Sequence, residues 1–326
     1  MKKKGSSSGA PKIRTVFMGT PLFADVILRE LIAREYHLVA VYTQPDKPVG
    51  RKQEIEESPV KRLAQSYSIP VEQPLRFDDT AFEKLKEYKP DLIVVAAYGR
   101  LLPENVIKLP GFGCVNVHAS LLPKLRGASP IQNSLLQGDA ETGVTIMLMD
   151  KGMDTGAILS QRSLPIDPQD TTSSLSEKLA LLGAQLLAET LPLWIERQIE
   201  PTPQDNTQAT LCQLIEREDG HIFWNEDAET IFNLFRALSP WPGIFGFWRQ
   251  PNDQLSRIKF KKISYQKINP QASRHLGEVF ELGEKIGVQT ASGIIFLETV
   301  HLEGKTEMSI QDFIKGYPQF IGSVLQ

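Results

Sequence analysis

Two polar side chains interrupt an apolar run in CVNVHASLLPKLRGASP, residues 114–130. Asn116 and His118 are two residues apart, so on a strand both side chains point to the same face. An amide can donate a hydrogen bond to a developing oxyanion, and an imidazole can transfer a proton. The segment therefore predicts a strand end at which a carbonyl group is attacked, with a proline-containing basic loop directly behind it.

A second stretch, MDKGMDTG at residues 149–156, places Asp150 and Asp154 in a glycine-rich turn after another apolar run. A carboxylate beside a histidine fixes the tautomer of the ring and raises its basicity. Each residue alone also has a structural explanation, because a strand-end histidine is most often a hydrogen-bonded structural group and Asn or Asp often completes a turn. Together they predict a group-transfer site in which an amine attacks a carbonyl without a covalent enzyme intermediate.

The elements that must position these residues alternate between short β-branched runs and amphipathic segments from Lys12 to about Ser160. This alternation predicts an α/β fold with a doubly wound, mostly parallel, Rossmann-like sheet. Strands are expected at 15–20, 38–43, 91–99, 113–120 and 142–150, with Pro21 at the start of the helix after the first strand, Ser58 as the N-cap of the next helix and Pro59 at its first helical position. Ligands of open α/β sheets bind at the carboxyl ends of strands, where Asn116 and His118 lie.

The second half of the chain changes character after a long amphipathic helix expected at 171–198. A polar segment rich in Pro, Thr and Gln follows, and then short apolar runs separated by glycines. This pattern predicts a smaller C-terminal β-barrel, OB-like domain. The expected organisation is a disordered tail at 1–11, a catalytic domain at 12–199, a linker at 200–210 and the barrel at 211–326.

The bulk properties exclude several classes of protein. No window approaches eighteen uninterrupted apolar residues, so no membrane span is expected, and MKKKGSSSGAP lacks the apolar core of a secretory signal. The two cysteines, Cys114 and Cys212, are too few for a disulfide framework or a metal cluster, which fits a reducing cytoplasm. The net charge is −3, so a polyanion would need a local basic patch.

The motifs resemble those of a known enzyme family. NVHASLLPKLRGASPIQ with TGVTIMLMDKGMDTGAIL resembles the folate-dependent formyltransferases, and VFMGTPLFA, TQPDKPVGR and AAYGRLLP narrow the resemblance to those that formylate methionyl-tRNA. The resemblance covers nearly the whole chain from about Lys12. It implies 10-formyltetrahydrofolate as the formyl donor and initiator methionyl-tRNA as the acceptor. No metal is expected, and the protein is expected to be a cytoplasmic monomer. It implies catalytic roles for Asn116, His118 and Asp154, and a folate site lined by Ser120, Leu121, Leu122 and Pro123.

The resemblance also suggests how tRNA is held. The polar loop at 43–59 would wedge against the acceptor stem, with Arg51 matching the important arginine of the family and Lys52 beside it. Four residues that follow in this loop depart from the family, which often has further bases there: Gln53, Glu54, Glu56 and Glu57. Fewer phosphate contacts predict a shallower dependence of binding on salt.

Other basic residues are candidates for anion contacts. Lys124 and Arg126 could meet a folate carboxylate or a tRNA phosphate, or could be solvated bases. In the expected barrel, Arg257, Lys259 and Lys261 alternate along RIKFKK and so share one strand face. The family has a C-terminal domain that helps to hold tRNA, so this face is the predicted backbone contact.

Several other functions compete with this interpretation. A nicotinamide-dependent dehydrogenase would need a Gly-x-Gly-x-x-Gly motif, which is absent, and its candidate ribose ligand, Asp46, stands between two prolines. A glycinamide ribonucleotide formyltransferase would resemble the first domain only, and TQPDKPVGR and GASPIQ argue against a sugar-nucleotide formyltransferase. A hydrolase that releases formate could use the same three residues. A tRNA-binding module without activity is disfavoured because all three catalytic residue types are present.

Overall fold

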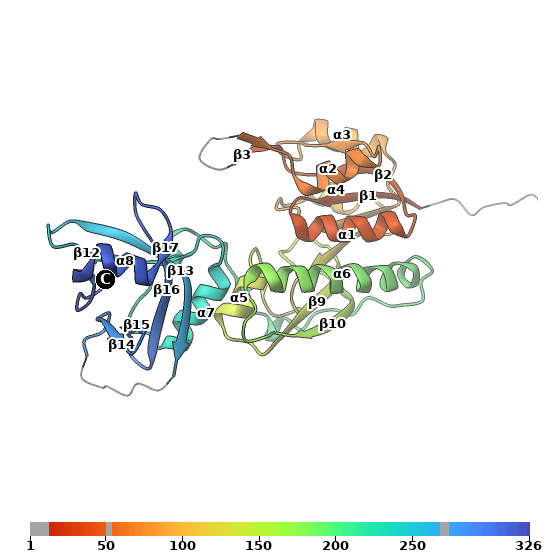
Figure 1. Ribbon diagram of the computed structural model, residues 1–326. Helices are drawn as coiled ribbons and strands as arrows, with labels where there is room; N and C mark the ends of the chain where they lie inside the picture. Colours follow the sequence, from red (N-terminus) through yellow and green to blue (C-terminus); the bar gives the residue numbers. More distant parts are fainter. Residues whose placement is uncertain (1–12, 50–53, 268–273) are drawn as a thin grey trace, which may run out of the picture. The chain divides into compact units, whose positions relative to one another are not determined.

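The computed structural model describes residues 13–49, 54–267 and 274–326, and the chain divides into two compact units (Figure 1). The first unit comprises Met1–Pro130, Glu141–Pro165 and Ser176–Cys212. The second comprises Ile131–Ala140, Ile166–Leu175 and Gln213–Gln326. The second unit thus takes in two segments that interrupt the first in sequence. The expected tail at 1–11 lies outside the described residues.

In the described part of the first unit, seven strands form one sheet in the order β10-β9-β7-β6-β1-β2-β5. The strands from β7 to β5 pair in parallel, whereas β9 is antiparallel to β7 and β10 to β9. The expected doubly wound, mostly parallel sheet is therefore confirmed. The strands are β1 (Arg14–Gly19), β2 (His37–Tyr42), β5 (Val71–Glu72), β6 (Leu92–Ala96), β7 (Cys114–His118), β9 (Glu141–Leu148) and β10 (Ile158–Pro165).

Helices follow these strands: α1 (Leu22–Ala33), α2 (Pro59–Ser66), α3 (Asp79–Glu87), α4 (Glu104–Ile107), α5 (Pro130–Leu136) and α6 (Thr172–Ile195). Ser58 caps α2 as expected, since its hydroxyl accepts from the N–H of Lys61 at 3.0 Å. Pro21 is the N-cap of α1 and so lies at the helix start, as expected. A small hairpin of β3 (Lys47–Val49) and β4 (Glu54–Glu56) projects from the loop after β2 (Figure 1).

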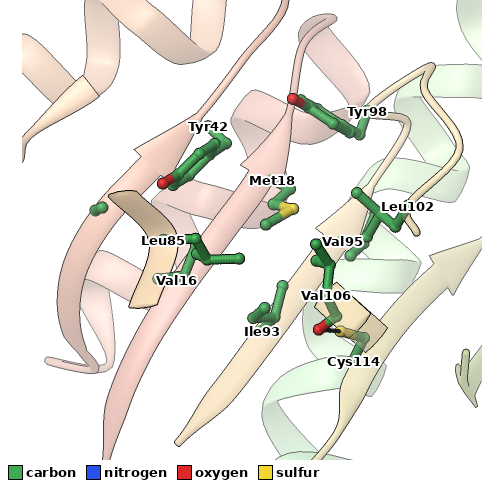
Figure 2. Packing of buried hydrophobic residues seen from close by; sticks show 11 residues of the cluster. Val16, Met18, Tyr42, Leu85, Ile93, Val95, Tyr98, Leu102, Val106 and Cys114 are labelled. Carbon is green, nitrogen blue, oxygen red and sulfur yellow. Dashed lines mark hydrogen bonds between the residues drawn. The ribbon is translucent and has the colours of Figure 1, made fainter. Parts of the chain in front are cut away.

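One face of the sheet carries a buried apolar cluster, and one of its side chains comes from β7, the strand of the candidate site. Figure 2 shows its side chains, which come from alternate positions of strands β1, β2, β6 and β7, from α3 and α4, and from the segment between β6 and α4. Cys114 of β7 belongs to it, and its thiol lies 3.8 Å from the carbonyl oxygen of Val106. Strand side chains alternate between faces, so Asn116 and His118 continue the row that Cys114 begins. The buried members are Val16, Met18, Ala40, Tyr42, Leu85, Ile93, Val95, Tyr98, Leu102, Val106 and Cys114.

The long helix α6 packs on the opposite face of the sheet. Gly183 approaches so closely that an added Cβ would lie 2.9 Å from Cγ1 of Val117, so the helix needs a glycine there. By length and composition alone, α6 is the one helix in the described ranges that could cross a membrane, but core helices meet the same criterion. Half of its apolar window is buried inside the protein, as in a core helix.

The second unit contains an antiparallel sheet in the order β12-β13-β16-β15-β14, with β17 paired to β16. The C-terminal residues bridge its two edges. Gln326 and Phe247 of β12 exchange main-chain hydrogen bonds of 2.7 and 2.9 Å, and Val279 of β14 donates to Ser323 at 2.9 Å. These bonds close the sheet into the expected barrel. Its elements are α7 (Ala228–Leu238), β12 (Ile244–Arg249), β13 (Leu255–Gln266), β14 (Val279–Leu282), β15 (Lys285–Gln289), β16 (Ile294–Leu302), β17 (Met308–Ser309) and α8 (Ile310–Gly316).

Candidate active site

The candidate site lies at the carboxyl end of β7, beside the point where the strand order reverses between β1 and β6. Asn116 is 9% exposed, and its neighbours across the sheet are Val95 of β6 and Met147 of β9. Within the described residues, the Asn116 side-chain amide makes no hydrogen bond. A buried amide normally has a partner inside the protein, so this amide is available to a ligand.

His118 ends β7 and is 6% exposed. Its Nε2 lies 3.0 Å from the carbonyl oxygen of Leu125. A carbonyl oxygen only accepts hydrogen bonds, so this contact requires the proton on Nε2. The other ring nitrogen, Nδ1, faces Oδ2 of Asp154 at 3.7 Å. The ring can therefore exchange a proton only through Nδ1, on the side where the carboxylate lies.

Asp154 is brought to His118 by the turn between β9 and β10. Its Oδ2 accepts from the N–H of Gly127 at 2.9 Å, and its φ of 53° lies in the left-handed region. Asp and Asn tolerate this conformation better than most residues do. Two residues on, Gly156 must be glycine, because an added Cβ would lie 1.8 Å from the carbonyl oxygen of Leu148. The structure thus brings together Asn116, His118 and Asp154, the three residues predicted to be catalytic.

The Ser-Leu-Leu-Pro loop is anchored to β9 by the hydroxyl of Thr145, which is fully buried. That hydroxyl donates to the carbonyl of Ser120 at 2.7 Å and accepts from the N–H of Leu122 at 3.0 Å. Gln161 of β10 donates to the same hydroxyl at 2.8 Å and to the Leu122 carbonyl at 2.7 Å. Ser120 and Leu122 are buried, so the more exposed Leu121 and Pro123 are the side chains of this loop that a ligand could reach.

We expect Thr145→Val to lower the free energy of unfolding by about 1 to 3 kcal/mol, because buried partners of the hydroxyl lose their hydrogen bonds. The loop would also loosen, so the Michaelis constant for the formyl donor that the motif resemblance implies should rise. Urea unfolding and initial rates would measure both. Thr142→Val, on the same strand but the opposite face, is the control. An unchanged Michaelis constant would show that Thr145 does not shape the donor site.

The polar segment expected to be a linker is bound to the first unit instead. Thr202 exchanges two main-chain hydrogen bonds of 2.8 Å with Ile158, and β11 (Leu211–Cys212) pairs in parallel with β8 (Arg126–Gly127). Between them, the Gln204 side chain contacts the turn that carries Asp154. Sequence reasoning missed these residues, because their polar composition is typical of a flexible connection.

The predicted anion contacts near the site fall in different surroundings. Arg126 is 5% exposed, and its guanidinium donates to the side-chain oxygens of Gln204 and Asn206. This position inside the protein does not suit a phosphate contact. Lys124 is exposed. Arg51 and Lys52 lie outside the described residues.

The predicted basic face of the barrel lies along β13, where residues 257–261 alternate in burial. Lys261 is exposed, and the half-buried Lys259 donates to the carbonyl of Pro242 at 3.1 Å. The guanidinium of Arg257 stacks on Phe245 at 4.2 Å from the ring centre. Burial lowers the pKa of Lys259, and so do, in turn, the charges of Lys261, Arg257 and Arg217. These four residues, Arg217, Arg257, Lys259 and Lys261, are here called the basic cluster.

Comparison with known proteins identifies the family. Residues 12–191 match the family described as "Formyl transferase", and residues 214–318 match "Formyl transferase, C-terminal domain". A methionyl-tRNA formyltransferase of Caldicellulosiruptor saccharolyticus is 43% identical over 314 residues, 95% of this chain and 99% of the relative. Another, of Geotalea uraniireducens, is 40% identical over 316 residues, 96% and 98% of the two chains. The chain belongs to the methionyl-tRNA formyltransferase family.

As a member of the methionyl-tRNA formyltransferase family, the chain is a transferase, and the resemblance seen in its motifs is confirmed. A likeness in fold extends further. The solved structure of HypX from Aquifex aeolicus in complex with tetrahydrofolic acid matches with a TM-score of 0.64 and 18% identity, over 95% of this chain and 48% of HypX. The fold of the family is thus shared with proteins of much lower sequence identity.

Proposed function

We propose that this protein transfers the formyl group of 10-formyltetrahydrofolate to the α-amino group of methionyl initiator tRNA, in the cytoplasm and as a monomer. The observation that carries the proposal is the unpartnered amide of Asn116, two residues from a histidine whose free ring nitrogen faces a carboxylate. The two relatives are named for this activity, and the chain matches them over nearly their whole length. HypX, similar in fold, binds tetrahydrofolic acid.

The chemistry asks for positioning and proton transfer rather than a covalent intermediate. The donor supplies a formyl group on an anilinic nitrogen, which makes it more reactive than a peptide. Free α-amines have a pKa of about 7.7 to 8.0, and esterification of the amino acid lowers it, so much of the acceptor is neutral near pH 7. One proton must leave the amine and one must reach the departing nitrogen, so the site needs groups that exchange protons.

The three residues have different roles in this proposal. The Asn116 amide donates to the formyl oxygen as that oxygen gains negative charge. His118 holds its Nε2 proton on the Leu125 carbonyl, so Nδ1 is its proton-transfer atom. Asp154 stabilises the charged ring and relays the proton, since its Oδ2 faces Nδ1. No group of three His, Cys, Asp or Glu side chains in the described ranges could hold a metal ion, and the proposed roles require none.

The edge of the sheet beside Asn116 fits a folate-type donor. The Tyr98 hydroxyl and Nε of Arg100, just beyond β6, are buried and have no hydrogen-bond partner in the described residues. Burial raises the pKa of Tyr98 to about 12, so its hydroxyl stays a donor. The neighbouring Leu101 side chain is 81% exposed. A pterin ring has hydrogen-bonding edges and apolar faces, so it suits this mixture of groups (Tyr98 is labelled in Figure 2).

The basic cluster is the proposed contact for the tRNA backbone in the second unit. Lys259 and Lys261 line a cavity of about 250 Å³ whose other walls include Thr171, Ser173 and Ser239. Hydroxyl and ammonium groups are the usual phosphate ligands in nucleic-acid complexes. Arg51, Lys52 and Lys124 are the other residues proposed to contact the tRNA, near its acceptor stem.

We expect Lys261→Ala to raise the Michaelis constant for tRNA and to reduce the slope of log affinity against log salt by about 1, with little change in kcat. Lys262→Ala is the matched control. Lys262 is the next residue, but its ammonium is paired with Glu298 at 2.8 Å. Titrations at several salt concentrations would compare the two. Equal slopes for the two variants would remove Lys261 from the tRNA contact.

The proposed function is tested by a formylation assay with 10-formyltetrahydrofolate and charged initiator methionyl-tRNA. Elongator methionyl-tRNA, an amino sugar nucleotide and a reaction without any acceptor are run beside it. Rapid transfer to the initiator alone is the expected result. Formate release that does not depend on tRNA would overturn the acceptor and favour the hydrolase, while transfer only to an amino sugar nucleotide would favour a sugar formyltransferase.

A further inference from the structure

One segment, Gln204–Cys212, runs along the loop and the turn that carry the proposed catalytic groups. It is called the strap here. At one end the strap pairs with β8, where Leu211 lies opposite Arg126 and Cys212 opposite Gly127. The approach is close, because an added Cβ on Gly127 would lie 2.2 Å from the Cys212 carbonyl oxygen, and the φ of Gly127 is 122°.

Just before this paired end, Thr210 of the strap bonds to Leu125, the residue whose carbonyl accepts from His118. The hydroxyl of Thr210 accepts from the N–H of Leu125 at 2.8 Å, and the Thr210 carbonyl accepts from the N–H of Arg126 at 2.9 Å. Leu125 is the residue whose carbonyl accepts from Nε2 of His118. The Leu125 carbonyl and the Arg126 N–H belong to one peptide group. Thr210 therefore holds the peptide group that orients the imidazole ring of His118.

The other end of the strap holds the backbone of Asp154. Gln204 is 9% exposed, and its amide nitrogen donates to the carbonyls of Asp154 at 2.8 Å and Gly156 at 2.7 Å. Its amide oxygen accepts from Nε and Nη2 of Arg126 at 3.0 and 2.7 Å. Nη2 also donates to Asn206 at 2.9 Å. Both donor hydrogens and the acceptor of Gln204 are thus used within this network.

The two backbones that the strap holds share an unfavourable conformation. Leu125 has a φ of 58° and Asp154 a φ of 53°, both in the left-handed region. Residues other than glycine keep this conformation only where the surrounding structure imposes it. Gln204 and Thr210 bond to these two residues, on either side of the His118–Asp154 pair.

We propose that Gln204 and Thr210 are positioning residues for the catalytic pair, with Arg126 orienting the amide of Gln204. The inference rests on the proposed roles of His118 and Asp154. In this proposal the strap acts on the reaction indirectly, by holding His118 and Asp154 in place. In this proposal Gln204 and Thr210 bond to protein groups and not to the substrates, so the strap should affect the rate of the chemical step and leave substrate affinity nearly unchanged.

The test uses the full chain with Gln204→Leu and Thr210→Val, which remove the side-chain hydrogen bonds at similar side-chain size and leave the main-chain bond of Thr210 to Arg126 in place. We expect each to lower kcat by about 10-fold or more, up to the 100- to 10,000-fold that general acid–base groups themselves contribute, with both Michaelis constants within about threefold of wild type. In an Asp154→Asn background, Gln204→Leu should lower kcat by less than about twofold, because residues that act as a unit are not additive. Full multiplication of the two losses would overturn the proposal.

A control separates positioning from general destabilisation. Gln289→Leu removes another buried amide, one that donates to the Thr290 carbonyl at 2.8 Å in the second unit. It should lower the melting temperature and leave kcat unchanged. Equal losses of kcat in Gln289→Leu and Gln204→Leu would mean that destabilisation alone explains the effect.

A readout without substrate separates this proposal from the proposed function. The Nε2 proton signal of His118, assigned by its absence in His118→Gln, should shift or broaden in Thr210→Val and remain unchanged in Gln289→Leu. An unchanged signal in Thr210→Val would overturn the role of Thr210, whatever the substrate. A wild-type protein that shows the signal but formylates no methionyl-tRNA would refute the proposed function alone.

Discussion

Replacing Asn116 with alanine is expected to lower kcat by about 100- to 1000-fold, the usual loss when one oxyanion donor is removed. The reason is local. Among the described residues no protein group bonds to the Asn116 amide, so its removal breaks no internal hydrogen bond. Ground-state binding should change little, since the interaction strengthens only as the formyl oxygen gains charge. Single-turnover rates at saturating donor and tRNA measure the effect.

The matched control for this prediction is Cys114→Ala. Cys114 lies on the same strand and the same face, 1% exposed, within the apolar cluster of Figure 2. Its truncation leaves a small cavity and should lower stability by about 1 kcal/mol without a large change in kcat. If Asn116→Ala keeps more than a tenth of the wild-type rate, Asn116 is not the oxyanion donor.

The sequence predicted the parts of the fold and site that depend on local periodicity. Asn116 and His118 share a face because strand side chains alternate, whatever the rest of the chain does. Their place at a carboxyl strand end follows from the alternation of strands and helices. The capping of α2 by Ser58 is equally local, because the residues that form it are three apart.

The sequence did not predict contacts that join distant segments. The distance of 3.7 Å between His118 and Asp154 depends on β9 lying antiparallel beside β7, so that the turn after β9 returns to the end of β7. The sequence suggests that Arg126 is a surface base. In the structure it is buried and bonds to Gln204 and Asn206, which are 78 and 80 residues away along the chain. The strap has the composition of a linker, and only its long-range hydrogen bonds distinguish it from one.

Asp154→Asn is expected to lower kcat by about 100- to 10,000-fold, the range that general acid–base groups contribute. Asparagine suits the left-handed backbone at this position, and its oxygen can still accept from the Gly127 N–H. The fold should therefore persist. What is lost is the negative charge opposite Nδ1 of His118 and the ability to take up a proton. Rates at saturating substrates, with melting temperatures beside them, measure this loss.

Asp150→Asn gives the matched comparison, because Asp150 lies in the same turn and is exposed. Its carboxylate accepts from the N–H of Gly152 at 2.9 Å and the hydroxyl of Thr155 at 2.6 Å, contacts that hold the turn. We expect it to keep kcat within about threefold of wild type, because screened, exposed charges contribute little. A similar large loss in both variants would mean that the turn needs its carboxylates for shape. A large loss in Asp154→Asn alone assigns the proton relay to the carboxylate that faces His118.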